Sequence, residues 1–143
     1  MRVDVSETID VARGRVFDLM SDARNEPTWN PKVTRCGLDT SEPVGPGSSF
    51  TAVYRGLTYS DAITEHERPS LLTFTVTGRL LSIVARMRFE ESGGSTQLGA
   101  VFDVQPHGVM KALLPAMAPV VRRDFRQALA GFRRFCESGA GAA

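Results

Sequence analysis

Tyr59 and Asp61 are the residues of this sequence best placed to do acid–base chemistry in an apolar environment. They stand in the run YSDAI at 59–63, whose alternation puts Tyr59, Asp61 and Ile63 on one face of a strand. A carboxyl among apolar neighbours has a raised pKa, as a general acid or base requires. Asp61 and Tyr59 are therefore candidate catalytic residues. The plainer interpretation is that Asp61 lies near a strand end or in an ion pair.

Four other ionisable residues occupy positions that could matter for chemistry. The strand periods place Glu7 and Arg35 on inward faces, although each can equally lie near a strand end or in an ion pair. His66 falls on the strand face opposite Ile63, where we expect a solvated side chain. His107 precedes a long helix and can reach the rim of an interior cavity. The sequence has no Ser-His-Asp order, no His/Cys cluster and no phosphate-cradling glycine loop, so we expect no metal and no cofactor.

The composition suits a single domain over residues 1–143, because a chain of this length can bury a core without a metal or disulfide. The formal net charge is +1, from 17 basic and 16 acidic residues, which gives no general field for holding polyanions. Several arginines gather near the C-terminus, and we interpret them as a solvated helix face rather than a nucleic-acid patch: Arg122, Arg123, Arg126, Arg133 and Arg134. We expect no nucleic-acid partner.

No apolar run reaches the roughly 18 residues of a membrane span, and the first residues lack the apolar core of a signal peptide. We therefore expect a cytoplasmic protein without stable membrane insertion, as a monomer or homodimer. Cys36 and Cys136 lie far apart and show no metal-ligand spacing, so we expect both to be reduced.

The segment from His107 to Cys136 carries the strongest periodic signal. Its apolar residues recur about every 3.6 residues, which predicts one long amphipathic helix: Met110, Leu114, Met117, Val121, Phe125, Ala128, Phe132 and Phe135. Pro115 and Pro119 lie inside this pattern, and each removes a backbone donor, so we expect a kink. The turn from Lys111 to Val120, facing the loops at Trp29 and Gly45, then forms either a mobile gate or a static bend.

The rest of the chain is mainly extended. Val3, Val5 and Ile9 alternate with polar residues in a first strand, and Asp10 can cap a helix that ends near Asp22. The segment 23–31 fits a second short helix or a turn. Six further strands follow, joined by short turns that favour antiparallel neighbours: Val33–Asp39, Ser48–Tyr54, Leu57–Glu67, Leu71–Thr77, Leu81–Glu91 and Thr96–Gln105. This order predicts an α+β fold, with one curved sheet covered by the long helix.

One face of the predicted sheet is far more apolar than the other. Periodicity does not distinguish a solid core from a ligand cavity behind that face, and for an unknown domain a solid core is the more common outcome. Several segments, however, follow a characteristic order: IDV at 9–11, VFDLMSD at 16–22, WNP at 29–31, PVGPGSSF at 43–50, ITE at 63–65 and LLP at 113–115.

In order and spacing these segments resemble the START-like superfamily of polyketide cyclase/dehydrase and lipid-transport proteins, also called SRPBCC or Bet v 1-like. The resemblance covers almost the whole chain. It implies a helix-grip fold, in which a seven-stranded antiparallel sheet wraps around a long C-terminal helix, two short helices follow the first strand, and a deep hydrophobic cavity lies between sheet and helix. It implies no single chemistry, since members include cyclases, aromatases, hydrolases, lipid carriers and hormone or allergen binders.

The expected ligand is a small hydrophobic molecule of polyketide, lipid or isoprenoid type, held by a carrier or binding protein. The alternatives are a polyketide cyclase, aromatase or dehydratase acting on such a molecule, and an interaction module that works through its helix face. Trp29 either closes the cavity mouth or packs the short helical segment onto the sheet. The expected ligand-binding residues are Trp29, Tyr54, Tyr59, Phe74, Met87, Phe102, Met110, Leu114 and Met117.

Overall fold

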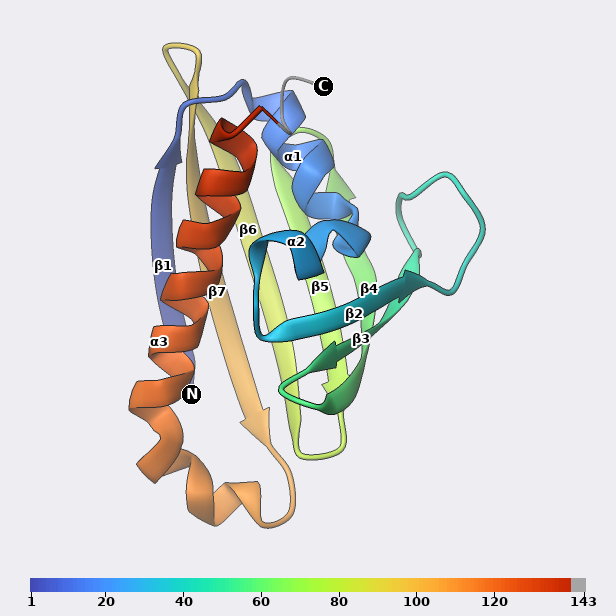
Figure 1. Cartoon of the computed structure of the whole chain (residues 1–143), viewed down its shortest axis with the longest axis vertical. Helices are drawn as coiled ribbons and strands as arrows, with labels where there is room; N and C mark the ends of the chain where they lie inside the picture. The colour runs from blue at the N-terminus through green and yellow to red at the C-terminus, as the bar shows by residue number, and fades with distance from the viewer. Residues whose placement is uncertain (140–143) are drawn as a thin grey trace.

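The computed structural model of the protein describes residues 1–139 and shows one antiparallel sheet with its helices on one side (Figure 1). The strands are β1 (Arg2–Ile9), β2 (Val33–Leu38), β3 (Ser49–Tyr54), β4 (Leu57–Glu67), β5 (Leu71–Gly78), β6 (Leu81–Ser92) and β7 (Ser95–Pro106). The helices are α1 (Arg13–Ser21), the 3₁₀ turn η1 (Ala23–Asn25), α2 (Glu26–Trp29) and α3 (Met110–Glu137). Each predicted strand agrees with the observed one to within about a residue at either end.

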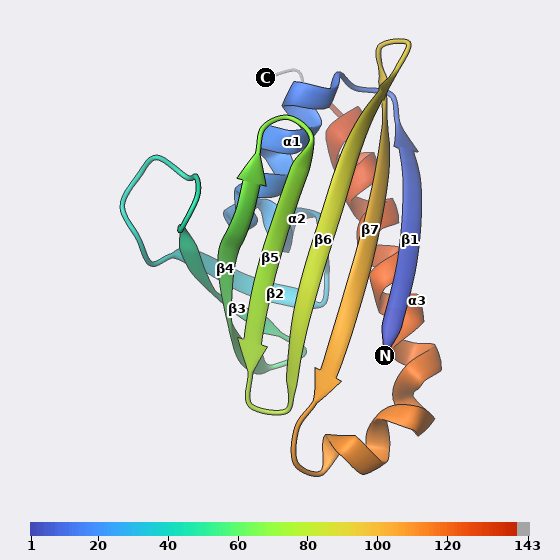
Figure 2. The ribbon, with the colours of Figure 1, turned by 180° about the vertical axis from the view of Figure 1, so that it is seen from behind.

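The strand order is β1-β7-β6-β5-β4-β3-β2, and every pairing is antiparallel. Strands β2 to β7 therefore follow one another as hairpins, while β1 lies at the far edge beside β7. The segment from α1 to α2 carries the chain across to β2 at the other edge. Seen from behind, the opposite face of the sheet is covered by none of the helices described within residues 1–139 (Figure 2). This is the expected seven-stranded helix-grip fold of the α+β class, and the prediction is confirmed.

Helix α3 forms 28 residues of continuous helix and packs along β1 and β7. It begins at Met110 rather than His107, because the His107 amide donates to the Leu80 carbonyl at 2.8 Å and holds that residue in the preceding loop. Pro115 and Pro119 lie inside the helix, and its first turns run at an angle to the remainder (Figure 1). No helix within residues 1–139 is long and apolar enough to cross a membrane.

The apolar core lies between the inner face of the sheet and the helices. Phe17 of α1 and Phe89 of β6 are fully or almost fully buried and meet edge to face, with ring centroids 5.2 Å apart. Helix α2 approaches α3 very closely, since a Cβ atom on Gly131 would come within 2.2 Å of the Trp29 carbonyl oxygen. Gly131 therefore lets the two helices meet through their main chains.

Two predictions of side-chain direction are wrong because the strands carry bulges. The register of β2 shifts between Val33 and Arg35, so Cys36 rather than Arg35 turns inward, and Arg35 is exposed. A second shift between Ile63 and Glu65 turns His66 onto the inner face. The His66 ring there packs edge-on against Phe17, with centroids 5.1 Å apart, instead of facing solvent.

The predicted Asp10 cap is also wrong. Helix α1 begins only at Arg13, and its N-cap residue Ala12 offers no side-chain hydrogen bond. The Asp10 carboxylate instead accepts a hydrogen bond from Ser95 Oγ at 3.0 Å, which ties the end of β1 to the β6–β7 turn. Glu7 faces α3 and lies 3.7 Å from Arg133, so it takes part in helix packing and not in the interior site.

Candidate ligand cavity

A cavity of about 320 Å³ lies between the inner face of the sheet and helices α2 and α3. Its volume falls at the lower end of the range that small-molecule pockets occupy. Strand alternation supplies apolar side chains such as Phe74, Met87 and Phe102 from neighbouring strands, and α3 adds Phe125. The Phe102 and Phe125 rings stack in parallel with centroids 4.1 Å apart, so they form one wall of the cavity.

The residues expected to bind a ligand all line this cavity except Leu114, which is buried but is not part of the lining. Met117 is 40% exposed, so it marks the outer part of the lining. Tyr59 lies over Gly78 of β5, where a Cβ atom would come within 2.4 Å of its ring. The missing side chain at Gly78 therefore creates the space that Tyr59 occupies.

Asp61 projects from the middle of β4 into this apolar interior. Its cross-strand neighbours are Phe50 on β3 and Val76 on β5, and only 7% of the residue is exposed. Among residues 1–139, no hydrogen-bond partner reaches its Oδ1 atom. Burial raises the pKa of Asp61 to about 6, because the apolar surroundings disfavour the ionised form. The interpretation of Asp61 as a strand-end or ion-paired residue does not describe this environment.

Glu26 also directs a carboxyl to the cavity, and it is not among the site residues expected from the sequence. It is the first residue of α2 and lines the cavity together with Trp29 and Asn30. Burial and the nearby Asp61 carboxylate raise the pKa of Glu26 to about 8, while a hydrogen bond from the Asn30 side chain opposes the shift. Helix α2 has only four residues, so the sequence carried no periodic signal for the inward direction of Glu26.

Trp29 packs its short helix against α3 rather than onto the sheet, and it also lines the cavity. Its indole packs edge-on against Phe132 of α3, with ring centroids 5.2 Å apart. The indole Nε1 is buried without a hydrogen-bond partner among the described residues. A buried donor without a partner costs free energy, so this N–H can be satisfied by an acceptor on a bound molecule.

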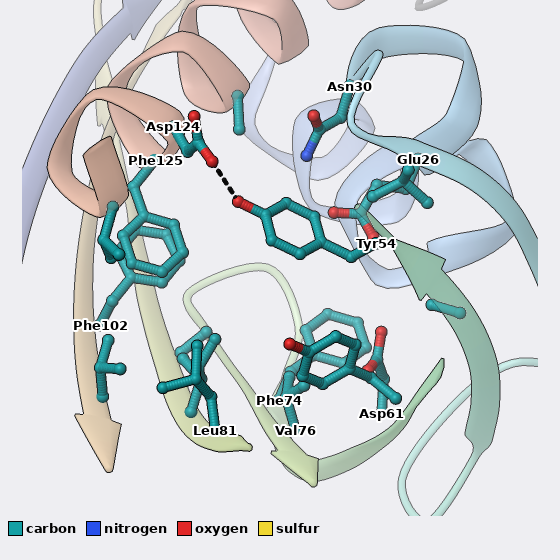
Figure 3. Close-up of a pocket in the computed structure, with 18 of the residues that line it drawn as sticks. Glu26, Asn30, Tyr54, Asp61, Phe74, Val76, Leu81, Phe102, Asp124 and Phe125 are labelled. Atoms are coloured by element: carbon teal, nitrogen blue, oxygen red, sulfur yellow. Dashed lines mark hydrogen bonds between the residues drawn. The ribbon is translucent and has the colours of Figure 1, made fainter. Parts of the chain in front are cut away.

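A buried polar network joins the β3–β4 turn to α3 on the other side of the cavity. Tyr54 Oη donates to Asp124 Oδ2 at 2.5 Å (Figure 3). Arg55 donates to the two carboxylate oxygens at 2.8 and 3.0 Å. Burial works against the charge on Asp124, but the hydrogen bonds from Arg55 and Tyr54 outweigh it and lower the pKa of Asp124. The Arg55-Gly56 turn has positive φ angles of 49° and 77°, as a tight two-residue hairpin requires.

The polar groups of the cavity are unevenly distributed. Glu26, Asn30 and Asp61 lie on one side, Phe102, Phe125 and the paired Asp124 lie on the other, and Tyr54 stands between them (Figure 3). Neither histidine lines the cavity: His66 packs on Phe17, and His107 Nε2 lies 2.7 Å from Ser82 Oγ. The arrangement therefore suits an amphipathic molecule, and its carboxyls can exchange protons close to neutral pH.

Comparisons with known proteins agree with this architecture. The aromatase/cyclase ZhuI from Streptomyces sp. R1128 superimposes with a TM-score of 0.79 at 13% identity, covering 98% of this chain and 95% of that chain. A START superfamily protein from Mycobacterium smegmatis gives a TM-score of 0.73 at 18% identity, with coverage of 91% and 94%. Ara h 8.0201 gives 0.74 at 13% identity, with coverage of 96% and 98%. At these identities the similarity establishes the fold alone.

No curated protein sequence matches this chain. The sequence profile of the family described as polyketide cyclase/dehydrase and lipid transport, however, matches residues 1–137. That match spans all seven strands and α3, including the segments that carried the resemblance. This chain therefore belongs to the polyketide cyclase/dehydrase and lipid transport family.

Proposed function

We propose that the protein binds a small hydrophobic molecule of polyketide, lipid or isoprenoid type in this cavity and acts as its carrier or binding protein. The observation that supports the proposal is the largely apolar cavity of about 320 Å³ between sheet and α3. Methionines at Met20, Met87, Met110 and Met117 belong to the lining, and flexible thioethers adapt to ligands of different shape.

A cavity-filling variant tests this proposal. Ala85 on β6 lines the cavity between its cross-strand neighbours Phe74 and Phe102, so Ala85→Phe places an aromatic ring in the space that a ligand needs. Val84 on the uncovered face of the same strand is 41% exposed, which makes Val84→Phe the matched control. We expect Ala85→Phe to abolish binding of the fluorescent probe 1-anilinonaphthalene-8-sulfonate, and Val84→Phe to retain it.

Native mass spectrometry on gently purified protein provides a second measurement. We expect a co-purifying apolar molecule in the wild-type protein and none in Ala85→Phe. If neither a co-purified molecule nor the probe binds the wild-type protein, the proposal is wrong. Circular dichroism identifies a variant that fails to fold and so keeps the comparison interpretable.

A second candidate function is cyclisation or dehydration of a bound polyketide, and the environment of Asp61 supports it. A carboxylate with a pKa of about 6 can remove a proton next to a carbonyl at neutral pH. Tyr59, two residues away on the same strand face, could donate to the enolate oxygen that forms. Holding a reactive chain in one orientation can supply about 7 to 11 kcal/mol.

The two functions differ in what Asp61→Asn and Tyr59→Phe do. A synthetic poly-β-keto thioester serves as the probe, and aromatic absorbance reports its cyclisation. An enzyme loses turnover in these variants while it still binds the probe, whereas a carrier shows no turnover in the wild-type protein. Turnover that survives both substitutions would exclude these residues as the acid and base.

A further inference from the structure

Aromatic residues line the cavity together with the carboxyls of Glu26 and Asp61. Tyr54 and Tyr59 meet edge to face with centroids 6.1 Å apart, and Trp29 lines the cavity beside Glu26 on α2. Asp61 lies on β4 two residues from Tyr59, on the same face of the strand. The cavity lining therefore includes these two acidic groups and three aromatic residues.

Neither carboxyl has a cationic partner. Within residues 1–139, no lysine or arginine forms an ion pair with Glu26 or Asp61. Among the described residues that line the cavity, Arg55 is the one cation, and its Nε and Nη2 atoms both donate to Asp124. A buried carboxylate without a counter-charge is costly, so this side of the cavity lacks one positive charge.

We propose that the ligand carries a protonated amine, which binds between Glu26 and Asp61 while its apolar body lies toward Phe102 and Phe125. This inference rests on the proposed function, because it names the polar group of the molecule that the cavity binds. An ammonium supplies several hydrogen-bond donors and one positive charge to a site whose two acids can only accept when ionised.

A neutral hydroxyl or carbonyl head group fits the same volume less well. The Trp29 N–H can satisfy one acceptor, but a neutral group leaves the negative charge of Asp61 uncompensated. Ionisation of both acids requires a cation between them, since each carboxylate otherwise opposes the ionisation of the other. Amine binding should therefore release a proton from the pair, and alcohol binding should not.

Two matched probes test the proposal by isothermal titration calorimetry on the intact protein at neutral pH: 2-(1-naphthyl)ethylamine and 2-(1-naphthyl)ethanol. They share one apolar body and differ in the head group. We expect the amine to bind at least about tenfold more tightly, as one or more charge-assisted hydrogen bonds imply. Titrations in phosphate and Tris, whose ionisation enthalpies differ, should show proton release with the amine alone.

Neutral variants of the two acidic residues show whether their carboxyls cause the preference for the amine. Glu26→Gln and Asp61→Asn should each weaken amine binding about tenfold and change alcohol binding less than about threefold. Glu90→Gln, on the uncovered face of β6, removes the same charge at an exposed position and should change neither affinity. The proton-release measurement on the wild-type protein remains informative if one cavity variant fails to fold.

Each outcome gives a decision. If the alcohol binds as tightly as the amine, or if both cavity variants retain amine affinity, the amine proposal is overturned and the hydrophobic binding function stands. If neither probe binds the wild-type protein, and 1-anilinonaphthalene-8-sulfonate does not bind either, the proposed function itself is overturned. Selective loss of amine affinity in both variants supports the proposal.

Discussion

Replacing Glu26 by glutamine should change how the stability of the protein depends on pH. Glutamine has the shape of the protonated glutamic acid and cannot ionise. The folded protein raises the pKa of Glu26 from its ordinary 4.5 to about 8, through burial and the charge of Asp61. Between pH 4.5 and about pH 8 the folded chain therefore binds up to one proton more than the unfolded chain. The free energy of unfolding falls as pH rises through this range.

The size of the effect follows from the shift. One pKa unit corresponds to about 1.4 kcal/mol, so the full shift has a ceiling of about 5 kcal/mol. Part of the pKa shift comes from the coupling with Asp61. We therefore expect the Glu26 carboxyl alone to contribute on the order of 3 kcal/mol to the free energy of unfolding. The contribution of the protonated Glu26 carboxyl to stability is complete below pH 4.5 and is lost as pH rises through about 8.

Urea unfolding of the wild-type protein and Glu26→Gln across this range measures the effect directly. At about pH 5 the two free energies of unfolding should be nearly equal, and at about pH 9 the variant should be more stable by about 3 kcal/mol. Glu90→Gln should follow the wild-type curve. A difference between wild type and Glu26→Gln that stays constant with pH would show that the Glu26 carboxyl is solvated or paired in the folded protein, and would refute the reasoning.

Three further predictions concern the walls of the cavity. Asp124→Asn should lower the free energy of unfolding by about 1 to 3 kcal/mol, because it removes the charge of a buried carboxylate that pairs with the half-exposed Arg55. Urea unfolding should show a smaller loss for Asp18→Asn, whose ion pair with Arg68 is exposed. Gly78→Ala should cost about 1 to 3 kcal/mol and weaken probe binding by displacing Tyr59, whereas thermal melts should show little change in Gly99→Ala, where a Cβ meets nothing within 4 Å. Replacing both prolines inside α3 by alanine restores two backbone donors. If the first turns of α3 form a gate, stopped-flow measurements should then show slower exchange of the bound probe. Unchanged exchange rates in a folded variant would show that these turns form a static bend.

Regular alternation made much of the fold predictable. The inward direction of Tyr59 and Asp61, and the long amphipathic helix, follow from local patterns that tertiary structure did not override. The predicted side-chain directions of Arg35 and His66 are wrong because one extra residue in a strand reverses every side chain beyond it. Neither bulge contains a glycine or proline that would mark it in the sequence.

The polar half of the cavity was harder to predict, because its residues come from separate elements. Glu26 belongs to a single turn of helix, which is too short to show a period. Asp124 did leave a signal: it is a carboxylate next to Phe125 on an otherwise apolar stripe of α3, and the structure explains it through Tyr54 and Arg55 far away in the sequence. Pairing of that kind depends on the assembled fold.

The close contact at Gly131 bears on how the cavity could acquire new ligand preferences. Helix α2 rests on α3 there through the Trp29 carbonyl, so the contact does not depend on the side chains of Glu26 or Asn30. The Glu26 side chain can therefore be exchanged while this contact stays the same, whereas the buried Asn30 side chain accepts a hydrogen bond from the Lys32 amide at 3.1 Å and holds the turn after α2. A library that varies residue 26 and keeps Asn30 and Gly131 would thus change the chemistry of the pocket on a fixed scaffold.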